Sequence, residues 1–141
     1  MIDLAVDIDH QLGLRASGVE LLIDPMPHAL GDPRLIKKAL RNLMDNAWKY
    51  ARDRNPPRVH VGFDQEKRAY FVRDNGVGFD MAQAPKLFGL FQRLHGDASV
   101  PGLGIGLAIC ARIVERHAGR IWADSQPGAG ATFWIKLPNP R

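Results

Sequence analysis

Apolar positions recur at helical spacing across residues 33–53, which predicts a long amphipathic helix. They fall on one side of that helix: Ile36, Leu40, Leu43 and Ala47. Asp32 is a favourable N-cap, and Pro33 suits the first helical position because its fixed φ fits a helix and its missing N–H is not needed there. The prolines of residues 55–57 cannot continue the helix, so we expect it to end before them.

Alternation of apolar and polar residues predicts strands elsewhere in the chain. Residues 58–64 place Val59, Val61 and Phe63 on one face, which indicates a half-buried strand. Residues 68–74 form a second strand after a short turn, so these two strands should pair antiparallel. Three further segments have strand-like patterns: residues 18–24, 119–125 and 131–137.

Two more segments have helical patterns. Residues 2–16 are typical of a short amphipathic helix, and residues 105–117 place Ile105, Ile109 and Ile113 on one stripe. Helices and strands in this mixed order, with at least one hairpin, predict an α+β fold. We expect a two-layer sandwich in which the helices pack on one face of a mixed sheet.

Composition bounds the kind of protein. The chain has 141 residues, 45% hydrophobic and 24% charged, which is typical of one soluble domain spanning residues 1–141. No apolar run approaches the length of a membrane span, and the N-terminus lacks the pattern of a signal peptide. The single cysteine, Cys110, excludes an internal disulfide and favours a reducing compartment. We therefore expect a cytoplasmic domain without membrane contact, with Cys110 as a buried hydrophobe.

The formal net charge is +4, and part of the excess lies in residues 49–58. No interleaved aromatic residues and no known nucleic-acid motif accompany these charges, so we expect no nucleic-acid partner. A solvated face, or attraction for an anionic ligand, explains them better.

The long helix carries an unusual polar row beside its apolar stripe. Asn42, Asn46 and Lys49 are spaced i, i+4 and i+7, which puts them on one side of the helix. A solvated face would explain one asparagine, but two of them a turn apart in a helix need a further reason. An amide oxygen is a suitable Mg²⁺ ligand, and a lysine ammonium neutralises phosphate oxygens.

The segment DNGVGFD follows a predicted strand and is punctuated by glycines. Asp74 closes the strand, and Gly76 and Gly78 follow at alternating positions. A simple turn is one explanation. The functional alternative is a carboxylate that accepts a hydrogen bond from a base amino group, with glycines that let a flat ring lie against the backbone.

The segment PGLGIGLAIC places Gly102, Gly104 and Gly106 at the entrance to a helix. The GxxxxGK[ST] pattern of a P-loop is absent, and both the spacing and the preceding polar stretch are wrong for a dinucleotide-binding fingerprint. The remaining explanation is a flexible loop that leads into a helix N-terminus and binds phosphate there. Backbone N–H groups and the helix dipole favour an anion at that position.

Taken together, NLMDNAWKY, DNGVGFD, LFGLFQRL and GLGIGLAI resemble the N, G1, F and G2 boxes of the GHKL (Bergerat-fold) ATP-binding family, in that order. The resemblance covers residues 30–138. Within the family, the chain is similar to the catalytic and ATP-binding domain of bacterial sensor histidine kinases, in particular their phytochrome-like branch. This implies a mostly antiparallel sheet, Mg-ATP as the bound cofactor and a role in two-component signal transduction.

The resemblance also implies roles for individual residues. Asn46 matches the Mg²⁺ ligand, Asp74 the carboxylate that reads the adenine amino group, and Thr132 a position behind the adenine. Phe88 and Phe91 match the FxxF that anchors a mobile lid. The catalytic roles would belong to Asn42, Lys49 and Arg93. The full set implied around the nucleotide is Asn42, Asn46, Lys49, Tyr50, Asp74, Gly76, Gly78, Phe88, Gly102, Gly104, Gly106, Leu107 and Thr132.

One position separates the branches of the family. Hydrolytic members carry a glutamate one turn before the metal asparagine, and anti-sigma serine kinases tend to carry an acid there, whereas this chain has Asn42. An amide cannot act as a general base, and a neutral imidazole acceptor needs little activation. Asn42 therefore favours an ATP-dependent histidine kinase.

The acceptor motif of such kinases is missing, because the sequence around His10 has neither the following acid nor the proline. We expect the acceptor histidine on a separate dimerisation and phosphoacceptor domain of the same kinase, with a response regulator downstream. A non-catalytic nucleotide-binding module and an anti-sigma-type serine kinase remain the alternatives.

Overall fold

The computed structural model describes residues 2–79, 81 and 104–138. These residues form three α-helices, one short 3-10 helix and five strands, in the order α1 (Ile2–Leu12), η1 (Arg15–Ser17), β1 (Glu20–Ile23), α2 (Pro33–Ala51), β2 (Arg58–Asp64), β3 (Ala69–Asp74), α5 (Gly104–Arg116), β4 (Arg120–Ser125) and β5 (Ala131–Lys136). Helix α1 is shorter than its predicted range, because Gly13 adopts a positive φ and a 3-10 turn follows.

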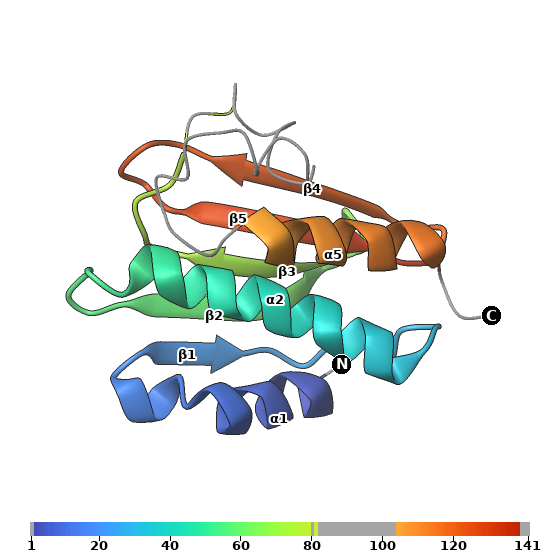
Figure 1. Cartoon of the computed structure of the whole chain (residues 1–141), viewed down its shortest axis with the longest axis horizontal. Coiled ribbons are helices and arrows are strands. Elements are labelled where there is room, and N and C mark those ends of the chain that lie inside the picture. The colour runs from blue at the N-terminus through green and yellow to red at the C-terminus, as the bar shows by residue number, and fades with distance from the viewer. Residues whose placement is uncertain (1, 80, 82–103, 139–141) are drawn as a thin grey trace.

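The strands form one sheet in the order β1-β2-β3-β5-β4. Strand β1 runs parallel to β2, and the other neighbouring pairs are antiparallel, including the predicted pair of β2 and β3. The three helices lie on one side of this sheet (Figure 1). The predicted α+β sandwich with a mixed, mostly antiparallel sheet is confirmed.

Helix α2 forms for the reasons that the sequence indicates. Asp32 caps it, its carboxylate accepting a hydrogen bond from the backbone N–H of Arg34 at 2.9 Å, and Pro33 takes the first position. The predicted stripe of Ile36, Leu40, Leu43 and Ala47 is buried in the core. The helix thus fixes the row of Asn42, Asn46 and Lys49 at the border between core and solvent.

Helix α5 buries Ile113 of the predicted stripe, but the stripe as a whole does not define its buried face. Leu107, Cys110 and Val114 are its most buried side chains, whereas Ile109 is only partly buried. Apolar residues occupy most of its circumference, so their period alone does not select the buried face. Cys110 is a free, fully buried cysteine, as expected, and burial raises the pKa of its thiol to about 12.

The two faces of the sheet differ. Because side chains alternate along a strand, Val72 and its register partners Val61 and Phe133 point toward the helices. The opposite face carries Phe71 and Trp134, whose rings lie 5.4 Å apart. Among the described helices, none is long and apolar enough to cross a membrane.

Candidate functional site

Asp74 is a buried carboxylate at the end of β3, only 5% exposed. Its Oδ1 atom accepts a hydrogen bond from the backbone N–H of Gly76 at 2.8 Å. Its Oδ2 atom is also buried but has no hydrogen-bond partner among the described residues. Burial raises the pKa of Asp74 to about 6, and the nearby N–H groups of Gly76 and Ala131 oppose that rise. One carboxylate oxygen is therefore placed to accept a hydrogen bond from a ligand.

Asn46 is the second buried polar group with an unused atom. It is 2% exposed, and its Nδ2 atom has no partner among the described residues. Rotation about the last side-chain bond exchanges the amide oxygen and nitrogen, so either atom can face the site. Tyr50, one turn further along α2, accepts a hydrogen bond at its carbonyl from the N–H of Val77 at 3.3 Å. The Asn46 side of α2 thus lies beside the loop that follows Asp74.

Asn42 joins α2 to the start of α5. Its Nδ2 atom donates a hydrogen bond to the carbonyl oxygen of Gly106 at 3.1 Å. A Cβ at Gly106 would make only ordinary contacts with the Asn42 side chain, at 3.7 to 3.9 Å. The first N–H groups of a helix have no partner within the helix, and those of α5 begin at Gly104. Asn42 therefore sets the position of a helix end that favours anions.

Lys49 forms an ion pair on its own helix. Its Nζ atom lies 3.0 Å from Oδ2 of Asp45, one turn earlier, and both side chains are partly exposed. Exposed ion pairs of this kind contribute only about 0–1 kcal/mol, so the ammonium can change partner at small cost.

Gly76 and Gly78 are required for a different reason from the one the sequence suggested. A Cβ at Gly76 would overlap the carbonyl group of Tyr50, and one at Gly78 would overlap the carbonyl oxygen of Gln126. Gly78 also has a φ of 66°, in the left-handed region that favours glycine. The missing side chains let the protein's own backbone segments pack together, whereas we expected them to admit a flat ring.

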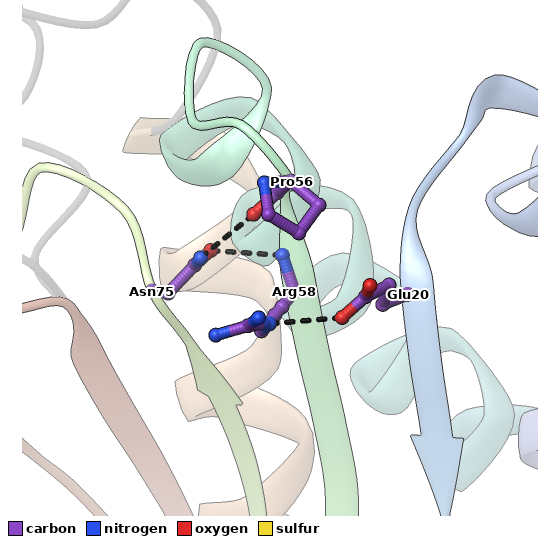
Figure 2. Close-up of polar contacts among 4 residues, drawn as sticks. All are labelled: Glu20, Pro56, Arg58 and Asn75. Carbon is purple, nitrogen blue, oxygen red and sulfur yellow. Dashed lines mark hydrogen bonds and ion pairs between the residues drawn. The ribbon is translucent and has the colours of Figure 1, made fainter.

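Asn75 fastens the same loop to the sheet, as Figure 2 shows. Its Oδ1 atom accepts from the N–H of Arg58 at 2.8 Å, and its Nδ2 atom donates to the carbonyl oxygen of Pro56 at 2.9 Å. Arg58 in turn donates from Nε to Glu20 at 2.8 Å. The sequence motifs did not predict this role of Asn75, although its position directly after Asp74 pointed to the same loop.

Comparison with known proteins identifies the family. Residues 31–141 match the family described as histidine kinase-, DNA gyrase B- and HSP90-like ATPases. The chain belongs to this family. It is an ATP-binding GHKL domain of the kind found in two-component histidine kinases, and the resemblance seen in its sequence motifs is confirmed.

Two curated relatives are histidine kinases or phytochromes. The methanogenesis regulatory histidine kinase FilI of Methanothrix harundinacea is 42% identical over 130 residues, covering 90% of this chain and 14% of FilI. The phytochrome-like protein Cph1 of Synechocystis is 37% identical over 127 residues, covering 89% of this chain and 17% of Cph1. The chain thus spans less than one fifth of the length of these relatives.

Solved structures show the same fold. The mycobacterial sensor histidine kinase MprB superposes with a TM-score of 0.78 at 24% identity, covering 99% of this chain and 95% of that structure. Full-length ShkA, solved in complex with AMPPNP, has a TM-score of 0.78 at 23% identity, covering 97% of this chain and 29% of that structure.

Two further residues that the resemblance implies around the nucleotide have well-defined surroundings in this GHKL domain. Leu107 is fully buried in the core. Thr132 pairs in register with Arg73, and its hydroxyl accepts a hydrogen bond from Nε of Arg73 at 3.1 Å, so it lies on the sheet face opposite the Asp74 side chain. The register partner of Asp74 is Ala131. A position behind a base on the Asp74 face would be that of Ala131, because neighbouring residues of a strand face opposite ways.

The contacts join the other predicted residues in two places. Asn42 in α2 contacts Gly106 in α5, and Tyr50 near the end of α2 contacts the loop after β3, which holds Gly76 and Gly78 and follows Asp74. Asn46 and Lys49 lie between Asn42 and Tyr50 on α2. Gly104 begins α5. The remaining predictions, Phe88, Phe91, Arg93 and Gly102, lie outside the described residues.

Proposed function

We propose that this domain binds Mg-ATP and transfers the γ-phosphate to a histidine on the dimerisation and phosphoacceptor domain of the same kinase. The phosphate would then pass to a response regulator. The observation that carries the proposal is the pair of buried, unpartnered polar atoms on Asp74 and Asn46. Buried polar groups are normally satisfied, so these two orphans, one on α2 and one at the end of β3, support a polar ligand between the two elements.

The residues present fit such a ligand. Oδ2 of Asp74 can accept a hydrogen bond from the adenine amino group, and the buried amide of Asn46 offers the neutral oxygen that Mg²⁺ accepts. Bound Mg²⁺ would neutralise phosphate charge. Lys49 would exchange Asp45 for a phosphate oxygen, and the N-terminal N–H groups of α5 would hold the phosphates in place. Arg93 is proposed as a second cation near the phosphates.

Asn42 supports transfer to histidine over hydrolysis. Its amide already donates to Gly106, and an amide cannot take a proton from water. A neutral imidazole carries its own nucleophilic lone pair and needs no such base. The described residues would thus position ATP and exclude alternative geometries, while the acceptor supplies the nucleophile.

Phosphotransfer in a mixture of purified components tests the proposal. The domain is incubated with γ-labelled ATP, Mg²⁺ and the histidine-bearing dimerisation domain of its own kinase. We expect acid-labile, base-stable phosphate on that domain, lost with Asn46→Ala. Acid-stable phosphate would indicate a serine kinase, ATP binding without transfer would indicate a nucleotide-binding module, and absence of ATP binding would overturn both.

A further inference from the structure

Arg54 joins three segments that are far apart in the sequence. It follows the end of α2, where its own N–H donates to the carbonyl oxygen of Ala51 at 2.8 Å. Its Nη2 atom donates to the carbonyl oxygen of Gly76 at 3.0 Å and to that of Gly128 at 3.1 Å. Gly76 belongs to the loop after β3, and Gly128 belongs to the turn between β4 and β5. One side chain therefore connects a helix end with both loops.

The two loops also touch each other through the backbone. The N–H of Gly128 donates to the carbonyl oxygen of Val77 at 2.6 Å, and the N–H of Phe79 donates to Oγ of Ser125 at 2.8 Å. A Cβ at Gly130 would overlap the carbonyl oxygen of Asp74, so the approach is close. These contacts come mostly from glycine-rich backbone, which has high conformational freedom when it is not held.

The guanidinium of Arg54 is bound by carbonyl oxygens. Its Nε atom is buried and has no hydrogen-bond partner among the described residues. The guanidinium forms no ion pair with a carboxylate of the described residues. Part of its charge is balanced by the carbonyl end of α2. Burying an unsatisfied N–H is costly, which indicates that the arrangement is retained for something other than stability.

The link to the site runs through Gly76. Its N–H donates to Oδ1 of Asp74, and its carbonyl oxygen accepts from Arg54. A shift of Gly76 would therefore move the hydrogen bond that orients the carboxylate. We propose that Arg54 is a positioning residue for base recognition, holding Gly76 so that the free oxygen of Asp74 points at the adenine amino group. This inference rests on the proposed function.

The test compares Arg54→Gln with Arg52→Gln, which removes the same charge two residues away from an exposed side chain. Affinities for ATP and GTP are measured by calorimetry, and backbone amide exchange is measured without nucleotide at Val77, Phe79 and Gly128. Each of these amides donates a hydrogen bond that holds one of the loops in place: Val77 to the carbonyl oxygen of Tyr50, Phe79 to Oγ of Ser125, and Gly128 to the carbonyl oxygen of Val77.

We expect Arg54→Gln to speed exchange at these three amides, weaken ATP binding about tenfold and leave the weaker GTP binding almost unchanged, so that base selectivity falls. Arg52→Gln should change none of these. Arg54→Lys keeps the charge but not the planar guanidinium whose Nη2 atom reaches both carbonyls, and should give intermediate values. It replaces Arg54→Gln if the latter does not fold.

Unchanged exchange in the two loops would overturn the proposal. So would faster exchange with an unchanged ratio of ATP to GTP affinity, because Arg54 would then stabilise the loops without positioning Asp74. Equal acceleration of exchange throughout the sheet would point to a general loss of stability and would also overturn it. If the unaltered domain bound no ATP, the proposed function itself would fail, and the base-positioning role with it.

Discussion

Asn42 and Gly106, 64 residues apart in the chain, are joined by a hydrogen bond of 3.1 Å from the side-chain amide to the main-chain carbonyl. The bond connects the polar row of α2 to the first turn of α5, the helix that carries the glycine-rich entrance. Asn42 thus has a structural role, because its amide can donate to this carbonyl and a carboxylate cannot.

Replacing Asn42 tests the direction of this hydrogen bond. Asn42→Ala removes the donor and should lower the free energy of unfolding by about 1 kcal/mol. Asn42→Asp is nearly isosteric but turns a carboxylate toward the Gly106 carbonyl, so it should cost more, about 2–3 kcal/mol. Urea denaturation at pH 8 measures both. A stability of Asn42→Asp equal to that of the unaltered domain would contradict the assigned donor.

The buried carboxylate of Asp74 should reduce stability at neutral pH. Its pKa is about 6 in the folded domain against an ordinary 3.8, because burial disfavours the charge. The folded state therefore binds the proton more tightly, and stability is lost as pH rises from about 4 to 6. Asp74→Asn removes the buried charge and should raise the free energy of unfolding by about 1–3 kcal/mol at pH 8.

The same variant should show little change at pH 3, where Asp74 is protonated in both the folded and the unfolded state. Denaturation curves at the two pH values measure the difference. Asp53→Asn, at an exposed position, is the control and should change neither curve. A stabilisation of Asp74→Asn that persists unchanged at pH 3 would show that buried charge is not its cause.

ATP binding should release a proton near pH 6. The adenine amino group donates a stronger hydrogen bond to an ionised Asp74 than to a protonated one, so binding favours the charged form and lowers its pKa from about 6. Affinity should therefore weaken as pH falls below 6. Calorimetry in buffers of different ionisation enthalpy counts the released protons, and the difference from Asp74→Asn removes the contribution of the nucleotide's own phosphates. Equal proton release by the two proteins would refute the role of Asp74.

Local patterns predicted most of the fold, because each depended on residues close in the sequence. The N-cap residue Asp32 predicted where α2 begins. The alternation of apolar and polar residues in residues 58–64 predicted the bounds of β2. Helical spacing alone was enough to predict that Asn42 and Asn46 lie on the same side of α2. In contrast, the buried stripe of α5 depends on which neighbours cover that helix, and a nearly all-apolar circumference does not encode them.

Site details that depend on long-range contacts were harder to predict. Ala131 is in register with Asp74 and Thr132 is not, so a shift of one residue along β5 changes the sheet face on which a side chain lies. Asn75 and Arg54 form hydrogen bonds to backbone groups 17 or more residues away, and a backbone carbonyl or N–H has no signature of its own in the sequence.

The ion pair of Lys49 and Asp45 should compete with ATP. The two groups lie 3.0 Å apart, and Lys49 must leave Asp45 to reach a phosphate. Asp45→Asn removes the competitor, so we expect the Kd for ATP to fall about two- to fivefold at low salt, with a smaller effect at high salt. Asp53→Asn makes the same change in net charge at an exposed position after α2 and should alter the Kd less. Equal gains for both variants, measured by calorimetry, would assign the effect to net charge, and weaker binding by Asp45→Asn would show that Asp45 itself supports the nucleotide site.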